Sequence, residues 1–148
     1  MKIDRRILIR SLLGVGTILS LPRLLFAARP DKAFESTDVN AVFAELYGDT
    51  PAASSRVAMK IPDIAENGAV VPVTVSTDLE NVESISVIVV NNPTPLAASF
   101  DLGPRSLPKI SVRIKMSESS VVRAVVKADG KLYSTEKVVK VTIGGCGG

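Results

Sequence analysis

The chain has 148 residues, which suits a single domain with a modest hydrophobic core. Its formal net charge is +3, but residues 1–28 hold five basic side chains and one acidic one, which leaves 13 Lys and Arg against 14 Asp and Glu in residues 29–148. Those remaining charges are scattered along the sequence, whereas a nucleic acid is bound by clustered cations that release its counterions. The composition therefore excludes a nucleic-acid-binding protein.

Two residue counts limit the chemistry further: the chain has no histidine and one cysteine. Histidine is the usual general base and a common metal ligand, so its absence excludes Ser–His and Cys–His nucleophilic pairs. A single cysteine excludes a disulfide framework within the chain and a thiolate cage for a metal. The sequence predicts no catalytic residue, no metal site and no cofactor.

Residues 1–28 have the features of an export signal. A short basic stretch that contains Arg5-Arg6 is followed by an apolar run over residues 11–21 and by small residues near Ala28. The paired arginines resemble a twin-arginine signal, which bacteria use to export folded proteins. The apolar run is short and interrupted by Gly and Pro, so we expect cleavage near Ala28 and no stable membrane span afterwards. An uncleaved membrane anchor is the alternative.

Residues 29–55 are predicted to form an N-terminal extension with one short helix. Residues 29–36 are expected to be extended. Thr37 or Asp38 can cap the helix that follows, and Gly48 ends it where a left-handed residue is favoured. Four apolar residues recur with helical spacing, namely Val39, Val42, Phe43 and Leu46.

From Arg56 onward the pattern predicts strands rich in Val, Ile and Thr, which suit a pleated surface. Pro72 cannot donate to a strand ladder, so its strand is expected to lie at a sheet edge or to carry a bulge. Asp129-Gly130 predicts a tight hairpin, because Gly accepts the positive φ that such a turn requires. The candidate strands are residues 57–61, 69–76, 82–90, 97–102, 110–116, 121–128 and 132–143, the last divided near Thr135 or Glu136 or continuous.

About seven short strands separated by regular turns indicate an all-β domain over residues 56–143. The expected architecture is an immunoglobulin-like antiparallel β-sandwich. The short N-terminal helix precedes it, and a flexible glycine arm over residues 144–148 is expected to follow it.

That last segment, Gly144-Gly145-Cys146-Gly147-Gly148, holds the single thiol. Glycine gives the arm slender flanks and backbone freedom, and Cys146 follows the predicted last strand by three residues, a reach of about 10 Å. A free thiol has a pKa of about 8.5, and no helix N-terminus, histidine or arginine lies nearby in sequence to lower it. We therefore interpret Cys146 as a covalent attachment point for a small substrate, which partner enzymes activate.

Three other interpretations of Cys146 are open. The thiol can form an intermolecular disulfide that holds a dimer of a structural β-domain together, or it can be an incidental residue of the tail. A self-sufficient thiol enzyme would need a resolving cysteine or a pocket that lowers the thiol pKa, and neither is visible in the sequence.

The chain resembles the SoxY family, the sulfur carrier of the bacterial thiosulfate-oxidising Sox system. The resemblance spans nearly the whole chain and includes the twin-arginine leader. The segments that carry it are Ile64-Ala65-Glu66-Asn67-Gly68, Asn92-Pro93-Thr94-Pro95-Leu96, Val139-Lys140-Val141-Thr142-Ile143 and the terminal Gly144-Gly145-Cys146-Gly147-Gly148.

This resemblance implies a periplasmic carrier that is not an enzyme. Cys146 would hold thiosulfate-derived sulfur as thioconjugates or persulfides, while heme, hydrolase and dehydrogenase components of the pathway act on it in turn. Gly144, Gly145, Gly147 and Gly148 would supply reach. The resemblance also implies a heterodimer with a SoxZ-like β-domain protein, whose export together with this chain would explain the Arg5-Arg6 signal.

Overall fold

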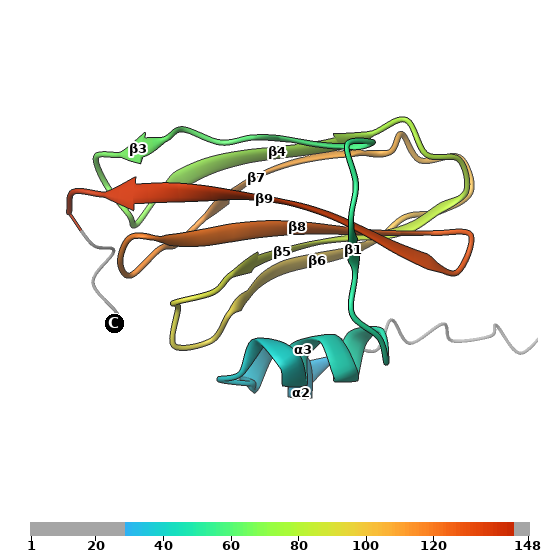
Figure 1. Cartoon of the computed structure of the whole chain (residues 1–148), viewed down its shortest axis with the longest axis horizontal. Coiled ribbons are helices and arrows are strands. Elements are labelled where there is room, and N and C mark those ends of the chain that lie inside the picture. The colour runs from blue at the N-terminus through green and yellow to red at the C-terminus, as the bar shows by residue number, and fades with distance from the viewer. Residues whose placement is uncertain (1–28, 144–148) are drawn as a thin grey trace, which may run out of the picture.

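The structure is a computed structural model that describes residues 29–143 and consists of two packed β-sheets with two short helices on one side (Figure 1). The helices are α2 (Asp31–Glu35) and α3 (Val39–Leu46). The strands are β1 (Ala52–Ala53), β2 (Val57–Lys60), β3 (Ile64–Ala65), β4 (Val71–Thr77), β5 (Val82–Val89), β6 (Leu96–Asp101), β7 (Lys109–Ile114), β8 (Ser120–Ala128) and β9 (Lys131–Val141). The predicted all-β sandwich is confirmed.

The larger sheet has the order β1-β9-β8-β5-β6, and β3 also pairs with β9. The smaller sheet has the order β2-β4-β7. Their facing sides form the main core, in which alternate residues of β4 such as Val71, Val73 and Val75 are at most 1% exposed. This alternation leaves the other side of the smaller sheet facing solvent.

The helices cover the outer side of the larger sheet. Val42 and Phe43 of α3 pack with Ile88 of β5 and Val125 of β8 in a second apolar cluster, to which α2 adds Ala33. As a result β5 and β8 are largely buried on both sides, and the last six residues of β5, including Ser84 and Ser86, are all buried. The molecule therefore has three layers: helices, larger sheet and smaller sheet.

Helix α3 forms as the sequence predicts. The Asp38 carboxylate accepts a hydrogen bond from the Ala41 N–H at 2.9 Å, and Gly48 adopts a φ of 70° just after the helix. The Gly48 N–H donates to the carbonyls of Phe43 and Ala44 at the helix end, and the Phe43 carbonyl also accepts from the Tyr47 N–H.

The expectation that residues 29–36 are extended is wrong, because Asp31–Glu35 form α2. Pro30 precedes its first residue, where a fixed φ and a missing N–H suit a helix start. Ala33 is fully buried in the second cluster, and the Arg29 guanidinium lies 4.5 Å from the centre of the Phe34 ring. Packing against α3 thus gives this short helix a stability that its own length does not provide.

All seven predicted strands are present, and the last is one continuous strand, β9. The Asp129-Gly130 hairpin is confirmed, with φ values of 49° and 69° at its two turn residues. The placement of Pro72 at an edge or bulge is wrong: β4 is the central strand of its sheet and pairs without a register shift. Proline is tolerated there because β2 ends at Lys60, opposite Thr74, so Pro72 lies beyond its last paired residue.

The sequence did not reveal β1 and β3, which are two residues long and both pair in parallel with β9. Between them the chain leaves the larger sheet, forms β2 in the smaller one and returns, which closes one side of the sandwich. Within residues 29–143, neither helix has the length and apolar character to cross a membrane.

Candidate functional site

The residues that the sequence singles out for function lie outside the described residues 29–143. They are Arg5 and Arg6 near the N-terminus and Gly144, Gly145, Cys146, Gly147 and Gly148 at the C-terminus. The structure does describe the residues that lead to these five C-terminal residues. Strand β9 ends at Val141, and Thr142 and Ile143 form a bend after it.

This end of β9 is held by the segment of residues 61–68, which we name the clamp loop. Its strand β3 pairs in parallel with β9, and the Asp63 carbonyl accepts from the Lys140 N–H at 2.9 Å. Thr142 is held twice, because its N–H donates to the Ala65 carbonyl at 3.1 Å and its hydroxyl donates to the Glu66 carbonyl at 3.0 Å.

The last described residue is held by the same loop. The Gly68 N–H donates to the Ile143 carbonyl at 2.8 Å, while the Gly68 carbonyl accepts from the Met116 N–H at 2.7 Å. Gly68 therefore joins Ile143 to the residues that follow β7. Because the bonded groups belong to the backbone, this attachment depends little on side-chain identity.

The clamp loop is itself fixed to the sheet. The Lys137 ammonium pairs with the Asp63 carboxylate at 2.8 Å and donates to the Ile61 carbonyl at 3.0 Å. On the opposite side of β9, the Ser119 hydroxyl accepts from the Val141 N–H at 2.9 Å. The chain therefore leaves the domain from a held point, although the Ile143 side chain is 68% exposed.

The position of this point limits where the thiol can be. Cys146 is three residues beyond Ile143, and three residues of extended chain span about 10 Å. Whatever conformation the intervening residues adopt, the Cys146 backbone stays within about 10 Å of Ile143. Sequence reasoning placed the thiol on an arm but did not find the loop that holds the base of that arm.

A second loop meets the same end of the sandwich. The Asn92 side chain donates to the Lys115 carbonyl at 2.7 Å and accepts from the N–H and hydroxyl of Ser117, both at 3.0 Å. The neighbouring Asn91 N–H donates to the Ser120 hydroxyl at 2.9 Å. The two internal segments that carry the resemblance, residues 64–68 and 92–96, thus lie in loops at the end of the sandwich where β9 stops.

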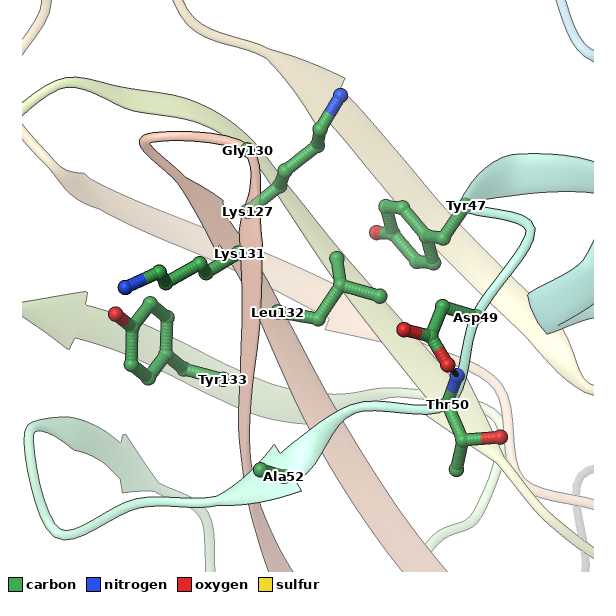
Figure 2. A pocket seen from close by; sticks show the side chains of 9 residues that line it. All are labelled: Tyr47, Asp49, Thr50, Ala52, Lys127, Gly130, Lys131, Leu132 and Tyr133. Carbon is green, nitrogen blue, oxygen red and sulfur yellow. Dashed lines mark hydrogen bonds between the residues drawn. The ribbon is translucent and has the colours of Figure 1, made fainter.

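A cavity of about 380 Å³ lies at the other end of the larger sheet, between the β8–β9 hairpin and the segment that follows α3 (Figure 2). Tyr47, Lys131 and Tyr133 are among its lining residues. The Tyr47 hydroxyl shares a hydrogen bond of 2.7 Å with Ser86, and burial raises the pKa of Tyr47. Lys131 is ten residues from Val141, about 33 Å along the strand, so this cavity is beyond the reach of the thiol of the same chain.

No cluster of acidic or thiol side chains suited to a metal ion occurs within residues 29–143. What the described residues provide is an attachment point: an immunoglobulin-like sandwich that holds the last strand firmly up to three residues before the only cysteine. The fold and the site therefore define a class of protein: a β-sandwich domain that holds a cysteine-bearing terminal segment at its base.

The chain belongs to the SoxY family, since the family model described as sulfur oxidation protein SoxY matches residues 43–146. The match runs from the middle of α3 to the cysteine itself. Among solved structures, the sulfur carrier protein SoxY from Chlorobium limicola f thiosulfatophilum is 41% identical with a TM-score of 0.64, over 72% of this chain and 97% of that one. The predicted family is confirmed.

A superoxide reductase (neelaredoxin) from Ignicoccus hospitalis is 18% identical with a TM-score of 0.52, over 57% of this chain and 78% of that one. At this identity the likeness concerns the fold alone. A search of curated protein sequences found no match to the chain.

Proposed function

We propose that this protein is a periplasmic carrier that holds sulfur intermediates covalently on Cys146 and presents them to the enzymes of sulfur oxidation. The observation that carries the proposal is that the clamp loop holds the chain up to Ile143, three residues before the only thiol of a SoxY-family chain. The domain fixes the residue that precedes the terminal segment, and chain length keeps the Cys146 backbone within about 10 Å of it.

The chemistry of loading explains why such a carrier depends on partners. When the Cys146 thiolate is joined to thiosulfate, a bond forms between the cysteine sulfur and the outer sulfur of thiosulfate, and two electrons are released. A heme protein of the pathway would accept these electrons. A hydrolase would then use water to release the terminal sulfonate group as sulfate, which leaves a persulfide on Cys146, and a dehydrogenase would oxidise the sulfur that remains.

The proposed partners also include a SoxZ-like β-domain protein, with which this chain would form a heterodimer. The Arg5-Arg6 pair supports export through the twin-arginine route, which transports folded proteins and so allows a partner without its own signal to accompany this chain. Replacement of both residues by Lys should retain both proteins inside the cell. Arrival of the partner alone in the periplasm would contradict the shared export.

The carrier function is tested by the intact mass of the protein purified from cells that oxidise thiosulfate. The parent chain should show sulfur-containing adducts that a thiol reductant removes, and Cys146→Ser should show none. Cys146→Ser should also abolish thiosulfate oxidation in a reconstituted pathway, since no other thiol is available. An unmodified parent protein under active oxidation, or an active Cys146→Ser, would reject the proposal.

The disulfide-linked alternative makes a different prediction on a non-reducing gel. A structural dimer should stay functional when its Cys146 disulfide is fully formed. A carrier should lose activity under the same conditions, because its thiol is blocked. Full activity of the locked dimer would therefore favour a structural β-domain over a carrier.

A further inference from the structure

The solvent-facing side of the smaller sheet is basic. Its outward residues alternate with the buried ones along β2, β4 and β7, and the hydrogen bond of 3.0 Å between the Thr74 and Ser111 hydroxyls joins two of them across the strands. Eight residues make up this surface, which we name the basic face: Ala58, Lys60, Pro72, Thr74, Ser76, Lys109, Ser111 and Arg113. Three of the eight are cations and none is a carboxylate.

The cations of the basic face are not neutralised by the rest of the described chain. Within residues 29–143, no ion pair involves Lys60, Lys109, Arg113 or the exposed Lys115, which continues the row beyond β7. The other residues of the basic face are Ala, Pro, Thr and Ser, whose side chains are short. The charged groups therefore surround a surface from which no large side chain projects.

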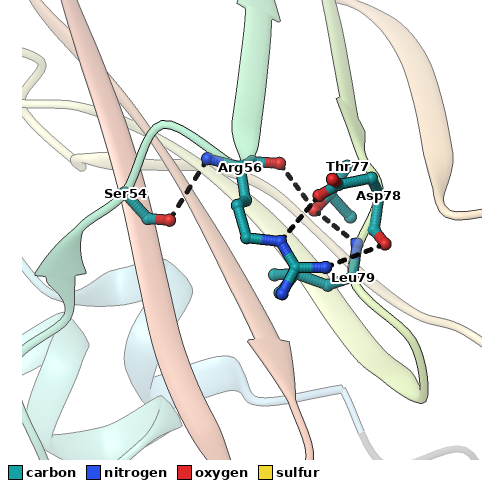
Figure 3. Close-up of polar contacts among 5 residues, drawn as sticks. All are labelled: Ser54, Arg56, Thr77, Asp78 and Leu79. Carbon is teal, nitrogen blue, oxygen red and sulfur yellow. Dashed lines mark hydrogen bonds and ion pairs between the residues drawn. The ribbon is translucent and has the colours of Figure 1, made fainter.

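Arg56, next to β2, illustrates the contrast (Figure 3). Its guanidinium donates to the Asp78 carboxylate at 2.9 Å and to the Asp78 carbonyl at 3.1 Å, while the Thr77 hydroxyl donates to the Arg56 carbonyl. A cation at this end of the sheet is thus paired within the chain, whereas those of the basic face are available to an external anion.

The helical layer on the opposite side of the molecule carries an excess of carboxylates. The helical layer, residues 29–49, carries five exposed carboxylates against two exposed cations. The carboxylates belong to Asp31, Glu35, Asp38, Glu45 and Asp49, and the cations to Arg29 and Lys32. Because the larger sheet separates the helices from the smaller sheet, the charges are polarised across the three layers. Such a distribution orients an approaching charged protein even when the net charge is small.

The basic face adjoins the point at which the clamp loop holds Ile143. Arg113 and Lys115 lie at the end of β7 and just beyond it, and the next residue, Met116, donates to the same Gly68 that holds Ile143. A protein that docks over Arg113 and Lys115 is therefore next to the point from which the terminal segment departs. Its active-site entrance would fall within the reach of the thiol.

We propose that the basic face is the docking surface for a partner protein that presents an acidic patch beside its active-site entrance. Docking there uses the charge polarity for orientation and brings the entrance within about 10 Å of the base of the Cys146 segment. The inference rests on the proposed carrier function for the role of the thiol, but the surface itself is argued from the described residues alone.

The test measures binding of the full mature chain, in its heterodimer if one forms, to the purified heme, hydrolase and dehydrogenase components of the pathway. The face variant is Lys60→Glu, Lys109→Glu and Arg113→Glu together. The control carries the same change in charge at exposed cations outside both the face and the clamp loop, Lys32→Glu, Arg105→Glu and Lys131→Glu. Arg113→Glu alone serves if the triple variant does not fold, as judged by circular dichroism.

At about 50 mM salt the face variant should bind at least one component about tenfold more weakly, mainly through slower association, and the difference should shrink at about 300 mM salt. The control should bind that component within about twofold of the parent. Equal binding of all components by face variant and parent would overturn the proposal. So would equal losses in the two triple variants, which would indicate net charge alone.

Sedimentation of the parent chain identifies a different occupant. Self-association that the face variant abolishes, without any loss of binding to the three components, would assign the basic face to a second copy of this chain and overturn the proposal. The carrier function fails separately, because it predicts sulfur adducts on Cys146 whether or not the basic face is altered.

Discussion

At the scale of single residues, short polar side chains decide where segments of this chain begin and how they are held. The Asp38 carboxylate accepts a hydrogen bond from a backbone N–H at the start of α3. The hydroxyl of Thr142, which follows β9, donates one to the Glu66 carbonyl. Both replace water as the partner of a backbone group at the end of an element. Each makes a prediction that concerns one hydrogen bond.

Replacement of Asp38 by Ala should lower the free energy of unfolding by about 1 kcal/mol, because the Ala41 N–H loses its carboxylate acceptor at the positive end of the helix dipole. Urea unfolding followed by circular dichroism measures the change. Asn40→Ala, at an exposed position in the same helix, is the control and should change stability little. Equal effects of the two substitutions would show that helix propensity, rather than capping, is being measured.

Replacement of Thr142 by Val keeps the side-chain shape but removes the donor to the Glu66 carbonyl. A hydrogen bond of this kind is worth about 1 kcal/mol, so the Gly68 amide, which donates to Ile143, should exchange with deuterium about fivefold faster. Exchange followed by NMR tests this, with Thr135→Val on the same strand as the control. Unchanged exchange at Gly68 would mean that the backbone hydrogen bonds alone hold the clamp loop.

At the scale of elements, the β8–β9 hairpin shows how a turn is anchored to the strand beside it. The Glu83 side chain of β5 accepts from the Gly130 N–H at 2.8 Å and pairs with the Lys127 ammonium at 2.9 Å. The Lys127 partner and the Gly130 N–H lower the pKa of Glu83, and Glu83 in turn raises the pKa of Lys127.

This arrangement predicts a window of pH in which the hairpin anchor stabilises the fold. The lowered pKa of Glu83 means that its contribution is present above the ordinary value of 4.5 and is lost as the pH falls through the folded-state pKa. The raised pKa of Lys127 means that its contribution is present below 10.5 and is lost as the pH rises through the folded-state pKa.

Glu83→Gln should therefore be less stable than the parent at neutral pH and nearly equal to it in acid below the folded-state pKa of Glu83. Urea unfolding at several pH values measures the difference. In a Lys127→Met background the same substitution should cost less at neutral pH, because only the bond to Gly130 is affected. A difference that stays constant from neutral to acid pH would refute the role of the carboxylate charge.

The elements that the sequence could predict are those whose signal is local. The alternation of buried and exposed residues in β4 and β7 and the Asp129-Gly130 turn depend on neighbouring residues. Strands β1 and β3 are two residues long and exist only because β9 provides a partner, so no periodicity indicates them. Helix α2 forms because Ala33 finds a buried place against α3, which is likewise a tertiary effect.

The candidate site divides in the same way. Cys146 and its glycines are visible in the sequence, and their role stays a prediction because they lie outside the described residues. The clamp loop was visible only as a segment of the resemblance, since it acts through backbone hydrogen bonds between residues about 75 positions apart, as from Thr142 to Glu66. Lys60, Lys109 and Arg113 likewise look scattered in sequence and gather only when β2, β4 and β7 pair.

At the scale of the whole molecule, the three layers share their apolar contacts. Phe43 is 3% exposed and packs with residues of both the helices and the larger sheet, and the Arg123 guanidinium of β8 lies 5.7 Å from the centre of its ring. Because β5 and β8 contribute to both apolar clusters, the helices and the sandwich should unfold as one cooperative unit.

Phe43→Ala tests this cooperativity. Loss of a buried ring should lower the free energy of unfolding by about 3–5 kcal/mol, whereas Phe100→Ala, whose side chain is 37% exposed on β6, should cost much less. Tyrosine fluorescence in a Tyr133→Phe background and circular dichroism supply separate probes, since Tyr47 follows α3, Tyr133 belongs to β9, and the dichroism reports mainly the strands. Both probes should give one coincident transition in urea for the parent and for Phe43→Ala. A tyrosine transition at lower urea that leaves the strand signal unchanged would mean that the helical layer folds onto an already stable sandwich. The charge polarity across the layers would then be lost before the sandwich unfolds.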